Sequence, residues 1–311
     1  MTSDIFDLET IARWRKVEWR ECLLGGVGIY GTRWPGHQAV ARFMFEAASF
    51  CGVLGEMKYA GYNVVGERRT RSIKPESFPR LLRSELKGAV NATGVLFVGE
   101  HPAPGIEGSF AYVGGEANGS RRVVRTLHGP KPAEGEPYYP LRADFIFPLT
   151  NDPADTASEL FRMAAELLDA EYGYYFVRDE LCFPGGYVGG FSAPLDYKAL
   201  EDRDAAEIGG WADFVRGPLW TGPWPKLRDL YEVNLLSERH TARPVEGLGY
   251  LAEWIEARPG RGRLTDIGKG RLLWTLTDAE LFNTRPLLNE AGLLVSCYER
   301  VYRNLQVKPS A

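Results

Sequence analysis

A strand–helix–strand unit in the middle of the chain constrains the fold most strongly. Residues 143–149 read Ala-Asp-Phe-Ile-Phe-Pro-Leu, an apolar run typical of a buried strand. Asp155 or Thr156 can cap a helix that extends to Ala170, and its apolar residues recur at the i, i+4 spacing of a helix packed on a sheet. Residues 172–178 form the next expected strand. The unit predicts a sheet that carries a helix on one face.

The rest of the chain indicates many short elements. It contains 35 glycines and 20 prolines among 311 residues, a composition that favours frequent turns. The Pro-rich segment 130–140 is the best candidate linker, and it separates an N-terminal half, 1–130, from a C-terminal half, 141–311. A shared strand–helix–strand order is compatible with two pseudo-repeated halves packed as one domain. We expect an α+β fold with mainly antiparallel sheets flanked by helices.

Charge and cysteine content narrow the classes of partner. The net charge is −4 and the pI about 5.8, whereas proteins that bind nucleic acid through its backbone are usually basic. The four cysteines are far apart and predict neither a zinc site nor a disulfide framework. The chain begins without a signal peptide and has no long apolar run. We therefore expect a cytoplasmic protein with no membrane, nucleic-acid or cofactor partner.

Two glycine-rich runs leave a nucleotide-binding enzyme open as an alternative. Gly26, Gly28 and Gly31 match G-x-G-x-x-G, which binds a pyrophosphate when it lies between a strand and a helix. Here a charged helical segment precedes the motif and Pro35 follows it, so we expect a flexible turn or a Gly-rich strand. The second run, 185–190, is a ligand loop or a tight turn over the core.

Motif searches favour binding over catalysis. The chain contains no G-x-S-x-G elbow, Walker loop, H-E-x-x-H or EF-hand loop. A contact surface is instead predicted around residues 201–224, where aromatic anchors and acidic residues that would steer a basic partner lie close together. The candidate residues are Trp211, Trp220, Trp224, Asp202, Asp204, Asp213 and, in the neighbouring Gly-rich run, Tyr187. The alternatives are an aromatic loop packed over the core and a solvated acidic helix face.

Residues 227–237 predict a buried central strand. Strand alternation would place Arg228 and Asp229 on opposite faces, so the polar groups of this stretch would not converge into a site. Asn234 is expected to fix the turn that follows. Downstream we expect a helix over 247–256, one or two strands within 264–276, and a helix capped by Asp278.

Four features of the C-terminal half carry a family resemblance. They are the strand Phe-Ile-Phe-Pro-Leu at 145–149 before an Ala/Leu-rich helix, the strand Tyr-Gly-Tyr at 172–174, the motif Val-Asn-Leu-Leu-Ser at 233–237, and a helix opened by Gly247 before Gly-Arg-Leu at 262–264. Over residues 140–300 the chain resembles the bacterial type VI secretion immunity family. That family has Val-Asn-Trp-Leu-Thr where this chain has Leu235 in the third position.

The resemblance implies a non-enzymatic protein that binds a cognate toxin and blocks it through contacts. In the cytoplasm such a toxin would be a nuclease or a nucleotide-consuming enzyme. A homo-oligomeric scaffold is the other alternative, since eight tryptophans and fifteen tyrosines are compatible with self-association.

Overall fold

The computed structural model describes residues 23–33, 35, 37–51, 60–62, 71–73, 77, 80, 96–98, 111–114, 121–127, 141–148, 152–179, 187–188, 211, 226–245 and 249–295. Eleven strands form one large sheet. In chain order they are β1 (Leu23–Gly31), β2 (Ala60–Tyr62), β3 (Arg71–Ile73), β4 (Leu96–Val98), β5 (Ala111–Gly114), β6 (Arg121–Leu127), β7 (Leu141–Pro148), β8 (Tyr172–Asp179), β9 (Val233–Ser237), β12 (Arg263–Gly268) and β13 (Arg271–Thr275).

The helices and a small second sheet complete the described elements. The helices are α2 (His37–Phe50), α4 (Pro153–Leu168), α8 (Glu238–Thr241), α9 (Leu251–Glu256) and α10 (Asp278–Glu290). The two-stranded sheet consists of β10 (Pro244–Val245) and β11 (Gly249–Tyr250).

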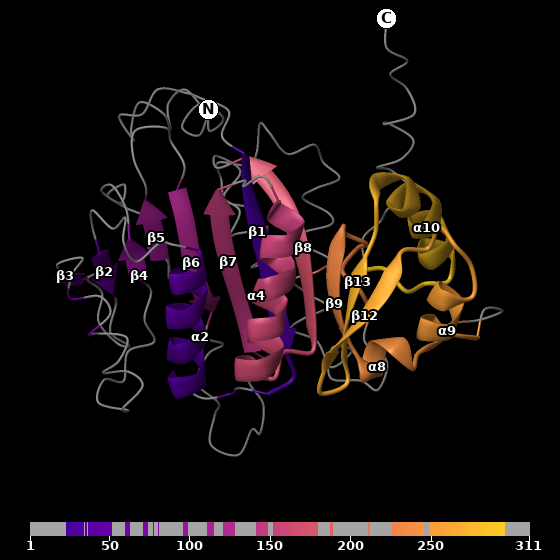
Figure 1. Ribbon diagram of the computed structural model, residues 1–311, viewed down its shortest axis with the longest axis horizontal. Coiled ribbons are helices and arrows are strands. Elements are labelled where there is room, and N and C mark those ends of the chain that lie inside the picture. The colour runs from indigo at the N-terminus through magenta and orange to yellow at the C-terminus, as the bar shows by residue number, and fades with distance from the viewer. Residues whose placement is uncertain are drawn as a thin grey trace, which may run out of the picture.

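The large sheet is almost entirely antiparallel. Its strand order is β12-β13-β9-β8-β1-β7-β6-β5-β4-β2-β3, and among these neighbours only β4 and β5 run parallel. Figure 1 shows α2 and α4 side by side in front of the middle of the sheet, while α8, α9 and α10 gather at its β12 end. The expected α+β class, with antiparallel strands flanked by helices, is confirmed.

The strand–helix–strand unit has one strand inserted at its centre. β7 and β8 both pair antiparallel with β1, which lies between them. α4 connects β7 to β8 and packs over β1. The N-cap of α4 is Asp152, whose carboxylate accepts from the Asp155 backbone N–H at 3.2 Å, so the expected caps Asp155 and Thr156 lie inside the first turn.

The two halves of the chain share this sheet. The Pro-rich segment 130–140, which lies outside the described residues, joins β6 to β7, and these strands pair directly. β1 comes from the N-terminal half and lies between two strands of the C-terminal half. A boundary at 130–141 would therefore fall between neighbouring strands of one sheet. The proposed pseudo-repeat stays a prediction.

The glycine-rich run at the start of the chain is a central strand. Gly26 and Gly28 pair with β7 on one side and β8 on the other, as a Gly-rich strand requires. A Cβ on Gly28 would lie 2.9 Å from the Tyr174 ring, and one on Gly25 would lie 2.7 Å from the Phe147 ring. Aromatic rings of the neighbouring strands occupy that space, so these glycines serve packing and not a pyrophosphate turn.

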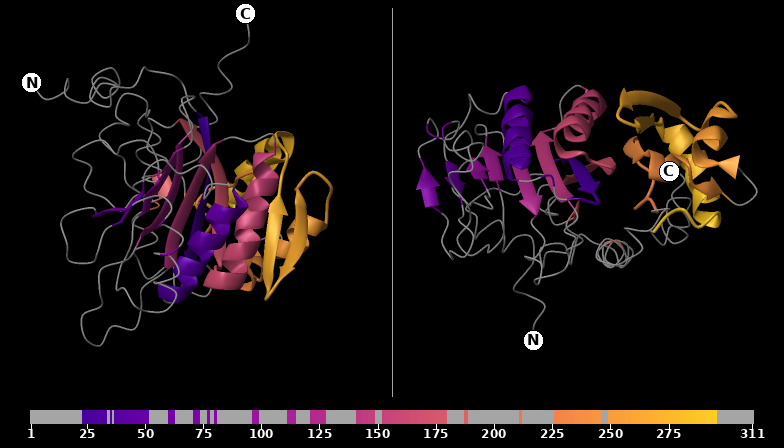
Figure 2. Two further views of the ribbon diagram at one scale, coloured as in Figure 1. Left: turned by 60° about the vertical axis from the view of Figure 1, so that its left-hand side comes forward. Right: turned by 90° about the horizontal axis from the view of Figure 1, so that it is seen from below.

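Each face of the sheet carries its own core. On the α2 and α4 face, apolar residues of both helices pack against β1, β7 and β8, with Phe161 and Phe145 fully buried. The opposite face is aromatic, and Tyr30, Tyr172 and Tyr174 lie there beside Trp274. Figure 2 shows α2 and α4 on the same side of the sheet when it is viewed from below. The aromatic face is the one that holds buried polar groups.

The C-terminal elements differ from the sequence expectations at their boundaries. The segment before β9 is irregular, because Leu227 forms an isolated bridge with Leu294 and the strand begins only at Val233. α9 begins at Leu251, four residues later than expected. The cap of α10 is Thr277, which forms a capping box with Glu280. Two strands, β12 and β13, occupy the region where one or two were expected.

Candidate functional site

Arg228 is a fully buried cation in the aromatic core, and the clearest candidate site lies around it. Alternation along β8 directs Tyr172, Tyr174 and Phe176 to one face of the sheet, and Tyr30 of β1 joins them. Because Gly28 has no side chain, the Tyr174 ring can lie flat against β1. The irregular segment before β9 then places Arg228 over these rings.

The guanidinium of Arg228 is bound by oxygens and by aromatic faces. Its Nη1 donates to the Tyr174 hydroxyl and, at 2.7 Å, to the Tyr187 carbonyl. Its Cζ lies 3.6 Å from the centroid of the Tyr187 ring, a close cation–π contact. The Arg228 backbone N–H donates to the Tyr172 hydroxyl at 2.8 Å. One residue thereby joins β8, the segment before β9 and residues 187–188.

A chain of hydroxyl groups extends this network. Tyr30 donates to the Val188 carbonyl at 2.9 Å and lies 2.8 Å from the Tyr174 hydroxyl. Trp211 donates its indole N–H to Tyr30 at 3.0 Å and meets the Tyr30 ring edge-on. The donor groups of Tyr30, Tyr174 and Trp211 each have an acceptor within this network, as buried polar groups require.

Two buried tyrosines of the cluster, Tyr172 and Tyr174, have raised pKa values. Burial is the largest cause, and it raises the pKa of Tyr172 and of Tyr174 well above the ordinary value near 10. The positive charge of Arg228 opposes this shift but does not cancel it. At neutral pH neither hydroxyl can serve as a base or a nucleophile. The hydrogen bonds of the cluster orient the backbone at Arg228, Tyr187 and Val188.

Asn234 of β9 hydrogen-bonds to the turn that precedes this strand. Its side-chain Nδ2 donates to the Tyr231 carbonyl at 2.6 Å, and its Oδ1 accepts from the Tyr231 N–H at 3.2 Å. The expected role of Asn234 in the following turn was wrong, because the chain after β9 enters α8 directly. Asp229 pairs with Arg285 of α10 at 2.9 Å and anchors the other end of this segment.

Ser237 and His240 form a buried pair at the start of α8. The Ser237 hydroxyl lies 2.9 Å from His240 Nδ1, and the His240 ring stacks on Tyr172. Burial first, and then the charges of Arg239, Arg271 and Arg243, lower the pKa of His240 to about 3. The pair forms a capping box and is closed to solvent, so it resembles a catalytic dyad only in residue type.

The neutral His240 predicts a specific dependence of stability on pH. Its pKa is about 3 in the folded chain and near 6.5 when exposed. The unfolded chain therefore binds more protons between these values, and folding loses stability as the pH falls from 6.5 towards 3. The linkage slope for one such group is about 1.4 kcal/mol per pH unit.

Replacing His240 by glutamine should remove this component. Glutamine can still accept in the Ser-x-x-Gln capping box. Urea unfolding of both proteins at pH 7 and pH 4.5 should show that the variant loses about 2.5 kcal/mol less than the parent on acidification. Equal losses in the two proteins would mean that His240 is protonated in the folded state.

The predicted contact residues fall into two groups. Tyr187 and Trp211 are buried in the aromatic cluster, where they bind Arg228 and Tyr30. Exposed anchors would be accessible to a partner, whereas these two side chains are buried. Their burial fits the alternative, in which aromatic residues pack over the core. The remaining five lie outside the described residues and stay predictions: Trp220, Trp224, Asp202, Asp204 and Asp213.

Sequence reasoning missed Arg228 as an organising residue. It assumed a regular strand, in which Arg228 and Asp229 would lie on opposite faces and form no convergent site. The available signal was the Arg228–Asp229 pair between Leu227 and Leu230, because charges beside apolar residues in a buried segment need enclosed partners.

Within the described ranges, no group of three or more His, Cys, Asp or Glu side chains is placed to hold a metal ion. Among the helices that the structure describes, none is both long and apolar enough to cross a bilayer.

A solved structure is similar to this chain, while family models and curated proteins give no match. No protein-family model and no curated protein matches the chain. Among solved structures, a type VI secretion system protein from Pseudomonas aeruginosa is similar, with 14% sequence identity and a TM-score of 0.45, over 88% of this chain and 73% of that one. Its name associates it with type VI secretion and does not mention immunity. Neither the fold class nor the proposal below rests on this likeness.

Proposed function

We propose that this protein acts by binding a protein partner, as an immunity protein that neutralises a toxin acting in the bacterial cytoplasm. The sequence resemblance over residues 140–300 supplies the class of partner. The structural observation that carries the proposal is the state of the Arg228 cluster. Arg228 is enclosed and hydrogen-bonded, and burial raises the pKa of Tyr172 and Tyr174 and lowers the pKa of His240.

This cluster stabilises a platform and leaves recognition to the surface. Arg228, Asn234 and the Asp229–Arg285 pair fix the irregular segment before β9 at the sheet. A rigid scaffold lowers the entropy lost on binding, which is how inhibitory proteins gain affinity without chemistry. Neutralisation would then follow from covering the active surface of the toxin.

Co-expression with the product of the adjacent reading frame tests the proposal. We expect that the neighbouring gene product arrests growth when expressed alone, that this protein restores growth, and that the two co-purify. Failure to rescue and to co-purify would contradict the proposal. A buffer-matched thermal-shift screen with nucleotides addresses the rival enzyme class, because a specific ligand stabilises by about 2.7 kcal/mol at a hundredfold excess over its dissociation constant.

The predicted contact residues give a second prediction. Replacing Trp220 and Trp224 together by alanine should weaken toxin binding at least about tenfold while the unfolding midpoint stays within a degree or so, because anchor residues of this type dominate interface energies. Titration calorimetry and thermal unfolding measure the two quantities. Unfolding of the double variant would mean that both residues belong to the core.

A further inference from the structure

The turn between α9 and β12 carries three arginines in six residues. Residues 258–263 read Arg-Pro-Gly-Arg-Gly-Arg, so that Arg258, Arg261 and Arg263 alternate with glycine and proline. Arg258 and Arg263 are exposed, and Arg261 is half-buried. No carboxylate within the described ranges forms an ion pair with any of the three. We call these residues the arginine turn.

The arginine turn is fixed in place by two neighbouring elements, α9 and β13. The Arg261 guanidinium lies 4.0 Å from the Trp254 ring centroid of α9 and donates to the Trp254 carbonyl. The Arg261 carbonyl accepts from Trp274 Nε1 of β13 at 2.8 Å. Gly262 adopts a φ of +84°, and a Cβ there would lie 2.5 Å from the Thr275 carbonyl oxygen. The charges are therefore presented by an ordered loop.

The charges of this turn lie close enough to repel one another. Burial is the first cause that lowers the pKa of Arg261, and the positive charge of Arg258 is the second. An anionic ligand would relieve this repulsion. The Glu280 carboxylate, which also receives the Gly262 N–H, is occupied by its capping box with Thr277. It lies beside the turn without pairing with its arginines.

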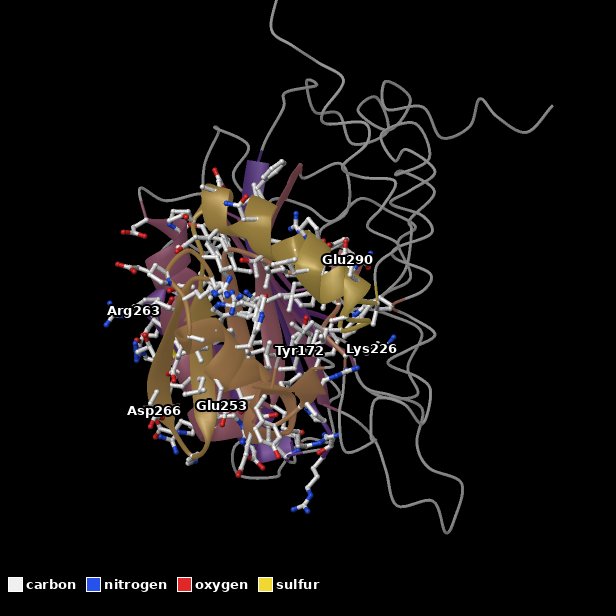
Figure 3. All side chains as sticks on the ribbon, turned by 90° about the vertical axis from the view of Figure 1, so that its right-hand side faces the viewer. Tyr172, Lys226, Glu253, Arg263, Asp266 and Glu290 are labelled. Carbon is white, nitrogen blue, oxygen red and sulfur yellow. The ribbon has the colours of Figure 1, made fainter. Side chains whose placement is uncertain are left out.

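The turn leads directly into an open edge of the large sheet. β12 is the terminal strand, and no described element pairs with its outer side. None of its six residues is buried. Figure 3, which views this end of the molecule, shows Arg263 and Asp266 along the outer margin of the ribbon. An edge strand presents unpaired backbone N–H and C=O groups that can accept a further strand.

We propose that an acidic, extended segment of a partner protein binds here, adding to the edge of β12 while its carboxylates contact the arginine turn. Arginine pairs well with carboxylates because its planar fork can donate two hydrogen bonds to one group. Arg258 and Arg263 are the two exposed arginines of the turn, and their guanidinium groups can reach such carboxylates. This acidic segment is opposite in charge to the basic toxin expected at residues 201–224. The two are therefore different partners, and the site at β12 does not depend on the proposed function.

An open edge favours a protein segment over nucleic acid. A nucleic acid offers no backbone groups to pair with β12, and three arginines would neutralise few phosphates. The far end of β12 also discourages a long uniform polyanion, because Asp266 is exposed there and its carboxylate accepts from the Gly268 N–H at 2.7 Å. The acidic end of the segment should therefore lie at Arg263.

Fluorescence anisotropy with defined probes tests the proposal on the full chain. The probes are a peptide of about ten residues that alternates glutamate with valine in one half and serine with valine in the other, its counterpart with glutamine in place of glutamate, and a single-stranded DNA of similar length. We expect that the acidic peptide binds, that the neutral one binds at least about tenfold more weakly, and that added salt weakens the first interaction. Hydrogen exchange should show new protection within β12.

Charge-reversal variants supply the matched control. Arg258→Glu with Arg263→Glu leaves the packed Arg261 intact and should reduce peptide affinity at least about tenfold. Arg33→Glu with Arg162→Glu makes the same change in net charge at two other exposed arginines and should leave affinity unchanged. Tighter binding of DNA than of the peptide, equal loss in both double variants, or protection outside β12 would each overturn the proposal.

Discussion

Alanine in place of Arg228 is expected to destabilise the protein by about 3–5 kcal/mol, as removal of one member of a buried polar network usually does. The substitution removes the partner of the Tyr174 hydroxyl and the Tyr187 carbonyl and leaves a cavity under the Tyr187 ring. Urea unfolding monitored by tryptophan fluorescence measures the change.

Methionine at the same position separates charge from volume. Arg228→Met fills much of the cavity and removes the buried charge, so it should be less destabilising than Arg228→Ala by roughly 1–2 kcal/mol. Arg258→Ala is the control, because that arginine is exposed and should change stability by less than about 0.5 kcal/mol. If Arg228→Ala unfolds within about 1 kcal/mol of the parent, the cluster does not hold the segment before β9.

Gly173→Ala should destabilise the centre of the sheet by about 3 kcal/mol or more, which is the upper range for overpacking. A Cβ at this position would lie 2.5 Å from Phe161 Cε1 and 2.8 Å from the Gly28 carbonyl oxygen. The second clash is with backbone in β1, the strand paired on both sides, so the sheet cannot shift cheaply. Equilibrium unfolding measures the effect.

Two further variants identify the cause of that loss. Phe161→Leu in the Gly173→Ala background should restore only part of the stability, because the contact with the Gly28 carbonyl remains. Gly292→Ala is the control for backbone strain alone, since its φ is +66° and nothing lies within 4 Å of the added Cβ. We expect about 1 kcal/mol there. Full rescue by Phe161→Leu would show that the backbone contact is harmless.

Local patterns in the sequence predicted the elements whose periodicity is strong. Apolar spacing identified α4 between β7 and β8, whereas the region of β12 and β13 was predicted only as one or two strands. The boundaries shifted where capping geometry decides them, as at Asp152 and Thr277, because several candidate caps stood within one turn.

The insertion of β1 between β7 and β8 could not be predicted from sequence. It depends on pairing across more than a hundred residues, and local patterns carry no information on such partners. The role of its glycines follows from the tertiary structure, in which the Tyr174 and Phe147 rings occupy the space that side chains at Gly28 and Gly25 would need. The same strand explains why the Pro-rich segment does not divide the sheet.

The sequence by itself determined the α+β class and the central strand–helix–strand unit, because both depend on local spacing. Only the tertiary structure decided that Arg228 is enclosed by Tyr174 and Tyr187, that Trp211 belongs to the core, and that the arginine turn borders an open sheet edge. Burial and electrostatic environment arise from residues far apart in the chain, and they exist only after the sheet has assembled.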